Sequence, residues 1–413
     1  MSELQGACMI AQSGGPTAVI NASAQGLIQT ALKSKCITKV LGAANGIQGV
    51  LTDTLYDMSY EDTRELELLR YTPASALGAS RYKLPPAEED DTDYKRILEI
   101  FKKYHVRYFF YNGGNDSMDT CYKISTYMQR VGYECRIIGV PKTIDNDLMG
   151  TDHCPGYGSA AKFIATVCME VHRDAYVYDP GAVTIIEIMG RHAGWLAGAA
   201  GLASWAGGGP DLIYLPEVPF DMADFLSRVE QIYEKKHKCL VAVSEGIRYA
   251  DGTYVFNTKA SSTDGFGHEQ LGGLAVMLAA AAGERTGAKA RGVELSLLQR
   301  CASHCASRTD MDEAFWAGQS AVEAAVSGIT DKMVGFSCTR ENGKYTCDIK
   351  LIDLKNVANL EQTVPLDWIK TDGTGVEQAF IDYVLPLIHG ELNPPKEYAL
   401  PRFARLKKVV AEP

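Results

Sequence analysis

Short apolar segments alternate with helix-like stretches through more than half of this chain, and this alternation limits the possible folds more than any other feature. The apolar segments have the length and composition of buried strands, at Ala7–Ala11, Tyr108–Tyr111, Arg136–Val140, Ala182–Ile188, Leu212–Leu215 and Leu240–Ser244. The helix-like stretches lie between them, at roughly Val19–Lys33, Tyr94–Lys103, Asp119–Val131, Gly158–Val171, Gly194–Trp205 and Met222–Lys236. Such alternation is typical of parallel sheets that carry helices on both faces. We therefore expect an α/β fold with two doubly wound, mostly parallel sheets.

The segments outside this alternation are expected to lie around the two sheets. The interval Asp53–Asp93 is polar and interrupted by prolines, which predicts a long excursion over a sheet edge with one short helix within Glu61–Leu69. Val334–Leu351 is expected to form a hairpin, because Asn342-Gly343 is a strong turn pair. The tail after Asn393 is rich in proline and then basic, so we expect a peripheral segment with a helix-like end.

Charge and hydropathy exclude two classes of partner. The net charge of −10 argues against nucleic acid, although local clusters of cations still allow phosphorylated substrates. The segment Met1–Gln12 lacks the basic start and apolar core of a secretion signal, and no run of roughly eighteen apolar residues occurs. We therefore expect no membrane partner and a cytoplasmic location.

The 11 cysteines include no Cys-x-x-Cys pair. Cys301, His304 and Cys305 have helical spacing, but three ligands on one helix are a poor zinc signature, so we expect them to be packing residues. Counting outward from the hairpin turn places Cys338 opposite Cys347. A cross-strand disulfide is geometrically possible there, but in a reducing cytosol we expect two free thiols.

The segment Pro141–Asp147, of sequence PKTIDND, follows an apolar strand and carries the strongest chemical signal. In an extended segment Thr143, Asp145 and Asp147 would point to one side. Two carboxylates beside Lys142 suit the removal of a proton from an alcohol next to a metal-bound phosphate. The alternative interpretation is a polar loop of Asx turns.

Two glycine-containing turns lie between a strand and a helix, as anion-binding loops do. The first is Ser13–Thr17, which contains Gly14 and Gly15, and the second is Gly113–Ser117, which adds oxygen ligands suited to magnesium and phosphate. The first has the spacing of neither a Walker loop nor a dinucleotide-binding loop. A plain tight turn and a helix N-cap are the alternatives. Both turns, like the PKTIDND segment, follow strands of the same expected sheet, and ligands bind at that edge.

Six motifs together resemble the phosphofructokinase family over roughly residues 6–320. They occur in the same order and at compatible spacing: Ser13-Gly14-Gly15, Gly113-Gly114-Asn115-Asp116-Ser117, Pro141–Asp147, Met189-Gly190-Arg191, Ser244-Glu245-Gly246 and Leu298-Gln299-Arg300. The resemblance implies phosphoryl transfer to the 1-hydroxyl of fructose 6-phosphate, with Mg²⁺ as cofactor. It also implies a donor domain at 1–155 completed by about 296–330, a sugar-phosphate domain at 156–295, and a hairpin with a peripheral C-terminal segment at 331–413.

The same resemblance implies roles for individual residues. Asp145 matches the general base, and Asp147 and Asn115 match positions on the metal side. Arg81 matches a phosphate-donor arginine, and Gly14 and Gly15 are expected to bind substrate as well. Lys142, Asp116 and Arg191 are expected to be catalytic together with Asp145. Contacts to the sugar phosphate or the transferring group fall to Thr143, Met189, Gly190, Arg191, Glu245 and Arg300, with Leu297 where related enzymes have a histidine. Arg291 matches an arginine that reaches a neighbouring subunit, so we expect a homo-oligomer, a dimer or a tetramer.

Two positions point to pyrophosphate rather than ATP as the donor. The ATP-using members have glycine where this chain has Asp116 and Lys142. A carboxylate at Asp116 repels the α-phosphate and sugar of a nucleotide, whereas Lys142 adds a cation for a compact anion. We expect the reaction to run in both directions. The alternatives are an ATP-dependent enzyme, a pyrophosphate-dependent kinase of sedoheptulose 7-phosphate, and a catalytically silent regulatory subunit of the same fold.

Overall fold

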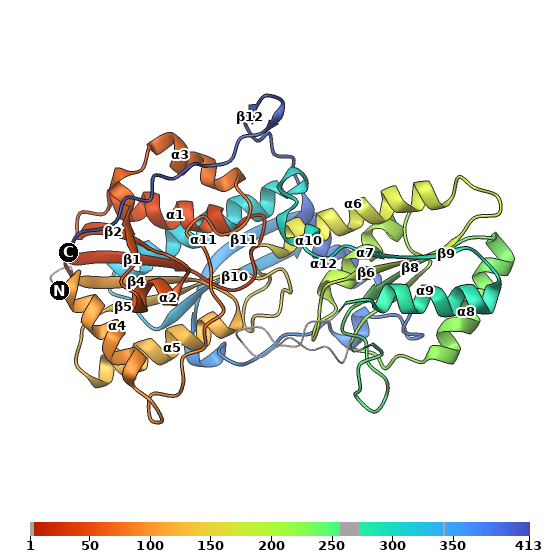
Figure 1. Ribbon diagram of the computed structural model, residues 1–413, viewed down its shortest axis with the longest axis horizontal. Coiled ribbons are helices and arrows are strands. Elements are labelled where there is room, and N and C mark those ends of the chain that lie inside the picture. The colour runs from red at the N-terminus through yellow and green to blue at the C-terminus, as the bar shows by residue number, and fades with distance from the viewer. Residues whose placement is uncertain (1–3, 257–271, 342) are drawn as a thin grey trace.

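The computed structural model describes residues 4–256, 272–341 and 343–413 and forms two α/β lobes side by side (Figure 1). The first lobe contains a seven-stranded sheet of order β11-β10-β5-β4-β1-β2-β3. Its strands are β1 (Gly6–Gln12), β2 (Ile37–Ala43), β3 (Leu55–Asp57), β4 (Val106–Gly113), β5 (Arg136–Pro141), β10 (Lys332–Glu341) and β11 (Lys344–Asp353). The five central strands are parallel, and the two edge strands β3 and β11 are antiparallel to their neighbours.

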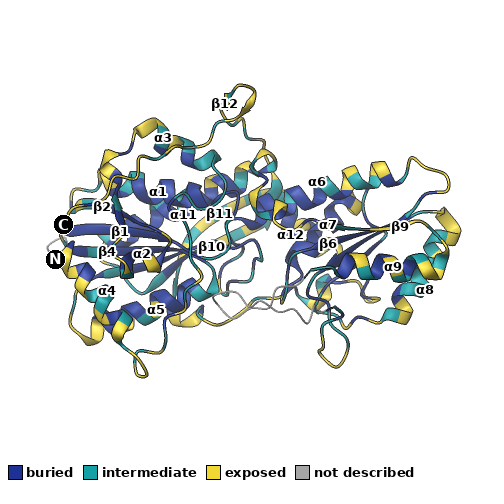
Figure 2. Cartoon of the chain, viewed as in Figure 1, coloured by how far each residue is buried: buried dark blue, intermediate teal, exposed yellow. Residues whose placement is uncertain are grey.

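Helices cover both faces of this sheet because alternate residues of each strand point to opposite faces. Met9 packs in one apolar cluster with α4 (Thr92–Lys103) and α5 (Asn115–Arg130). Its neighbours Cys8 and Ile10 pack in another with α1 (Ile20–Lys33) and α11 (Arg308–Val326). The central strands β1, β4 and β5 are buried on both sides (Figure 2). The short helices α2 (Ile47–Leu51) and α3 (Thr63–Leu68) lie in the excursion after β2.

The second lobe contains a four-stranded, fully parallel sheet of order β7-β8-β6-β9. Its strands are β6 (Val183–Ile188), β7 (Leu212–Tyr214), β8 (Cys239–Ser244) and β9 (Ala290–Glu294). One face packs against α6 (Tyr157–Ala175), α7 (Trp195–Trp205) and α12 (Gln378–Val384), and the other against α8 (Met222–Lys236) and α9 (Leu274–Thr286). The α/β fold with two doubly wound, mostly parallel sheets is therefore confirmed.

The alternation predicted the strands and helices that have continuous apolar runs. It did not identify β2, β9, α9 or α11. The strand β2 contains Thr38 and Lys39 near its start, and β9 contains Arg291 and Gly292, so neither presents an unbroken apolar run. Within the described residues, no helix is both long and apolar enough to cross a lipid bilayer.

Residues 331–413, expected to form a hairpin and a peripheral C-terminal segment, contribute to both lobes. The expected hairpin forms, with Asn342 at its turn outside the described residues, but β10 pairs with β5 and so extends the first sheet. Farther along, Phe380 and Val384 of α12 are fully buried in the core of the second lobe. The hairpin thus belongs to the first lobe and α12 to the second. Each covers apolar surface that its lobe would otherwise expose to water.

The expected helix at the end of the chain is wrong. After a short hairpin of β12 (Lys396–Glu397) and β13 (Leu400–Pro401), the tail runs extended across the first lobe past α3 (Figure 1). The backbone of Ala411 donates to Leu55 at 2.8 Å, and Asp57 donates to Val409 at 2.9 Å. The edge strand β3 offers unpaired backbone groups, so the tail pairs with them instead of forming its own helix.

Candidate active site

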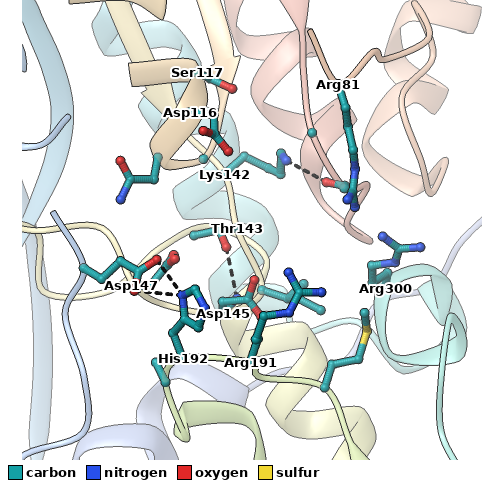
Figure 3. A pocket seen from close by; sticks show the side chains of 18 of the residues that line it. Arg81, Asp116, Ser117, Lys142, Thr143, Asp145, Asp147, Arg191, His192 and Arg300 are labelled. Carbon is teal, nitrogen blue, oxygen red and sulfur yellow. Dashed lines mark hydrogen bonds and ion pairs between the residues drawn. The ribbon is translucent and has the colours of Figure 1, made fainter. Parts of the chain in front are cut away.

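The carboxyl ends of the strands in both lobes face one cavity of about 560 Å³ (Figure 3). The first lobe contributes the ends of β1, β4 and β5, and the second contributes the ends of β6 and β8. Thirteen of the residues named from the sequence line this cavity: Gly14, Gly15, Arg81, Asn115, Asp116, Lys142, Thr143, Asp145, Asp147, Met189, Arg191, Glu245 and Arg300. Motifs more than 200 residues apart in the sequence are thus brought to one site.

Three sequence-predicted residues do not line the cavity. The backbone N–H of Gly190 donates to Glu245 Oε1 at 3.4 Å, so this glycine positions a carboxylate that lines the cavity. The side chain of Leu297 is 58% exposed outside the cavity. Arg291 lies early in β9, with Nη1 4.0 Å from Asp174 Oδ2, away from the carboxyl edge of its sheet. Its expected contact with a neighbouring subunit stays a prediction.

Lys142 is the most deeply buried cation of the site. Its Nζ donates to the carbonyl of Gly15 at 2.6 Å, and its backbone N–H donates to Gly113 at 3.0 Å, so it joins the two glycine turns. Burial lowers the pKa of Lys142 to about 7, an effect that Asp145 opposes and that Arg300 and Arg81 reinforce. A bound anion near Nζ would restore the ordinary preference for the charged form.

Glycine in the first turn lets two cationic side chains approach the backbone closely. Gly14 adopts a left-handed backbone with φ of +73°, and a Cβ there would lie 3.3 Å from Lys142 Nζ. A Cβ at Gly15 would lie 3.0 Å from the guanidinium of Arg300. The turn therefore exposes its backbone to the cavity between two cations, as an anion-binding loop does.

The two central carboxylates, Asp145 and Asp147, are partly buried and both disfavoured as anions. Burial raises the pKa of Asp145 despite the nearby Lys142. Burial, the charge of Asp145 and the charge of Glu361 raise the pKa of Asp147 to about 7. Asp147 Oδ1 has no hydrogen-bond partner among the described residues. A cation bound there would satisfy this oxygen and stabilise both carboxylates in their charged forms.

On another wall of the cavity, Glu245 and Arg300 face the same space from different elements. Glu245 follows β8, and its backbone N–H donates to Ile188 at 2.8 Å. Burial, and next the charge of Asp145, raise the pKa of Glu245 to about 7. Arg300 comes from the short helix α10 (Leu298–Cys301), and its Nε is buried with no partner among the described residues. This wall thus offers an acceptor for hydroxyl groups and a cation for a phosphate.

Sequence reasoning missed Glu361, and it assigned no role to His192, which also lines the cavity. Glu361 forms an antiparallel bridge with Leu148, immediately after Asp147, and its Oε1 lies 3.0 Å from His192 Nδ1. No local motif marks residue 361, because only the tertiary fold brings its segment to the site.

Asn115 holds this late segment in place. Its Nδ2 donates to the carbonyl of Leu360 at 2.6 Å, and its Oδ1 accepts from the backbone of Asn359 at 2.7 Å. The amide oxygen expected to bind a metal therefore already accepts one hydrogen bond. Its role as a metal ligand stays a prediction that relies on the second lone pair of this oxygen.

Comparison with known proteins agrees with this geometry. Residues 7–325 match the family described as Phosphofructokinase. A protein of Halomonas elongata named pyrophosphate–fructose 6-phosphate 1-phosphotransferase is 44% identical, over 96% of this chain and 95% of that protein. A protein of the same name from Xanthomonas campestris pv. campestris is also 44% identical, over 98% and 97% of the two chains. The crystal structure of a pyrophosphate-dependent phosphofructokinase from Nitrosospira multiformis superposes with a TM-score of 0.90 at 40% identity, covering 99% of this chain and 98% of the other.

Proposed function

The chain belongs to the phosphofructokinase family, and we propose that it transfers a phosphoryl group from pyrophosphate to the 1-hydroxyl of fructose 6-phosphate. The products are fructose 1,6-bisphosphate and phosphate. The observation that carries the choice of donor is the presence of both Asp116 and Lys142 in the wall of the same cavity, beside the Gly14 and Gly15 turn (Figure 3).

Asp116 and Lys142 favour a compact anion over a nucleotide. Asp116 lies in the first turn of α5, where the start of a helix otherwise attracts phosphate groups. Its carboxylate occupies this position and repels the α-phosphate that ATP would place there. Pyrophosphate lacks an adenosine group, so its two phosphates fit between Lys142, Arg81 and the glycine turn.

The acceptor is activated by the carboxylate of Asp145. We assign Asp145 as the general base that takes the proton from the 1-hydroxyl, because burial raises its pKa and so makes it a better base than an exposed aspartate. Lys142 and Arg191 stabilise the charge on the transferring phosphoryl group. Glu245, Met189 and Arg300 orient the sugar phosphate, with Thr143 at the start of the catalytic loop, which comprises residues 143–147.

Phosphotransferases of this family use a divalent metal ion, and the residues present fit one. The buried, unpartnered Oδ1 of Asp147 is the principal ligand that we assign, with the Asn115 amide oxygen as the second. We propose Mg²⁺, since these are hard oxygen ligands and the remaining positions suit phosphate oxygens and water. The ion supplies charge neutralisation on the two phosphates when it is bound.

Steady-state assays with purified full-length chain test this function. Each donor, pyrophosphate and ATP, is paired with fructose 6-phosphate and with sedoheptulose 7-phosphate in the presence of Mg²⁺. We expect turnover with pyrophosphate and fructose 6-phosphate, and the reverse reaction from fructose 1,6-bisphosphate and phosphate. Turnover with ATP alone contradicts the proposed donor, and no turnover with any pair favours the silent regulatory subunit.

Arg291 is the residue that bears on assembly. We propose a homo-oligomer, a dimer or tetramer, in which Arg291 reaches the sugar phosphate bound by a neighbouring subunit. Its place on β9, away from the cavity of its own chain, supports this assignment. The cytoplasm remains the expected location, since both proposed substrates are multiply charged.

A further inference from the structure

Two thiols lie opposite each other on the hairpin of β10 and β11. The strand register pairs Cys338 with Cys347, and both are free and half-buried. Opposite residues of an antiparallel pair have Cα atoms about 4.5 or 5.5 Å apart. Both separations lie within the range of roughly 4.4–6.8 Å that a disulfide bridges. The two sulfurs can therefore be joined without moving either strand.

Cys338 lies beside an imidazole and a phenol. Its Sγ lies 3.8 Å from His153 Nδ1 and 3.4 Å from the hydroxyl of Tyr345, which donates its own proton to Glu313 Oε1 at 2.8 Å. Although burial opposes it, hydrogen bonding to Asp152, Cys338 and Glu313 raises the pKa of His153 well above its usual range. The imidazole lies between two carboxylates that favour its charged form, with Nδ1 3.1 Å from Asp152 Oδ1 and Nε2 2.8 Å from Glu313 Oε2, and Cys338 is in contact with it.

The two thiols differ in acidity. Contact with the Cys347 thiol, helped by His153 and Tyr345, lowers the pKa of Cys338 to about 6, whereas the same contact raises the pKa of Cys347. The other charges facing this cluster are already paired. Arg340 Nη2 and Nη1 donate to the two oxygens of Asp152 at 2.7 and 2.9 Å. Cys338 is therefore the attacking thiolate, and Cys347 is the resolving thiol.

We propose that Cys338 and Cys347 are a redox modification site that forms a reversible intrachain disulfide on exposure to a hydroperoxide. The Cys338 thiolate attacks one peroxide oxygen, the O–O bond breaks, and the protonated leaving oxygen departs, as water in the case of hydrogen peroxide. Cys347 then attacks the resulting Cys338 sulfenic acid, forming the S–S bond and releasing a second water. Two electrons pass from the sulfurs to the peroxide, and a dithiol reductant reverses the change.

A metal site is the competing interpretation of this cluster. Asp152, His153 and Cys338 each have a potential ligand atom, and these atoms lie within 4.8 Å of one another. However, the guanidinium of Arg340 already binds both oxygens of Asp152, so a second cation would have to displace it. The cluster is better explained as the environment of a thiolate.

Tryptic mapping tests the disulfide directly. Trypsin cleaves after Arg340 and Lys344, so Cys338 falls in the peptide 333–340 (MVGFSCTR) and Cys347 in the peptide 345–350 (YTCDIK). The full-length chain is treated with hydrogen peroxide in the presence of a chelator, alkylated and digested without reductant. We expect these two peptides to be joined, and to separate after dithiothreitol. Recovery of the two peptides unjoined, with Cys338 as sulfinic acid, would overturn the proposal.

A second measurement tests the role of His153. In His153→Gln the rate of iodoacetamide reaction at Cys338 at pH 7 should fall at least about threefold, because the lost thiolate fraction outweighs the gain in nucleophilicity. Tyr345→Phe removes a weaker contact and serves if the first variant does not fold. The exposed Cys301 is the internal control, and its rate should not change. An unchanged rate at Cys338 in both variants contradicts activation by this cluster.

Discussion

The hydroxyl of Tyr383 on α12 accepts a hydrogen bond from Asn146 Nδ2 at 2.8 Å, in the middle of the catalytic loop. Asn146 lies between Asp145 and Asp147, is only 2% exposed, and has a left-handed backbone with φ of +57°. Its Oδ1 accepts from the backbone of Cys154 at 2.9 Å. The hydroxyl of Tyr383 donates in turn to the carbonyl of Asp152 at 2.8 Å. A helix from the end of the chain thus fixes the loop that carries both carboxylates.

Removing this hydroxyl should lower both stability and catalysis. Tyr383→Phe leaves a buried amide and a buried carbonyl without their partner, at a cost of about 1–3 kcal/mol in the free energy of unfolding. The matched control is Tyr157→Phe, because the Tyr157 hydroxyl is also buried and bonds Trp195 at 3.1 Å but does not touch the loop. We expect similar losses of stability in chemical denaturation, but a fall in kcat of about tenfold or more only in Tyr383→Phe. Equal kcat values for the two variants would make Tyr383 a purely structural residue.

The donor pocket can be tested by removing both residues that distinguish it. We expect Asp116→Gly combined with Lys142→Gly to reduce kcat/KM for pyrophosphate by at least about 100-fold, because the cation that faces the transferring group is lost. Lys83→Gly is the matched control, since this lysine lines the same cavity but is exposed. It should retain most of the activity. Full pyrophosphate turnover in the double variant would show that the donor binds elsewhere.

The buried Lys142 makes stability depend on pH. Its pKa is lowered to about 7 in the folded chain, so between about pH 7 and its ordinary pKa near 10.4 the unfolded chain binds the extra proton. Its unfavourable contribution is therefore fully present below pH 7 and disappears as the pH rises toward 10. In the absence of substrates, Lys142→Met should be more stable than the parent chain by on the order of 4 kcal/mol at pH 6, and nearly equal at pH 10.

Denaturant titrations at the two pH values measure this difference. Lys83→Met controls for a lysine on the same cavity wall that is exposed, so it should show no comparable gain at pH 6. Saturating pyrophosphate with Mg²⁺ should reverse the order and make the parent chain the more stable one, because the bound anion offsets the cost of the buried charge. A gain that stays the same at pH 6 and pH 10 would contradict a titrating lysine.

The sequence predicted the parts of the site that are local and missed the parts that depend on tertiary contacts. Lys142, Asp145 and Asp147 follow an apolar strand within one segment, so strand periodicity and chemistry together located them. Glu361 and Tyr383 lie in a stretch without motifs, and they meet the loop only because α12 packs into the second lobe while its preceding segment crosses the cavity. Pairing between remote segments produces no periodic pattern in the sequence. For the same reason the tail, which pairs with β3, was expected to be helical.

Asp310 is predicted to be a structural carboxylate that joins the lobes rather than part of the catalytic set. From the first turn of α11, its Oδ1 accepts from the backbone of Gly156 at 2.8 Å and its Oδ2 accepts from Ser159 at 2.8 Å, at the start of α6. Burial raises its pKa, and these hydrogen bonds oppose that shift by favouring the anion. Asp310→Ala leaves both donors buried and unpaired, so we expect a loss of about 3 kcal/mol in unfolding free energy.

Asp310→Asn separates the lost charge from the lost contacts. Its amide oxygen can replace only one of the two acceptors, so the loss should be intermediate between those of the parent chain and Asp310→Ala. The exposed Asp312 on the same helix is the control, and Asp312→Ala should cost no more than about 1 kcal/mol, since its ion pairs with Arg70 and Arg308 are long and solvent-exposed. KM for fructose 6-phosphate should change little in the folded fraction of each variant, because Asp310 does not line the cavity. A loss of substrate affinity without a loss of stability would instead place Asp310 in the binding machinery.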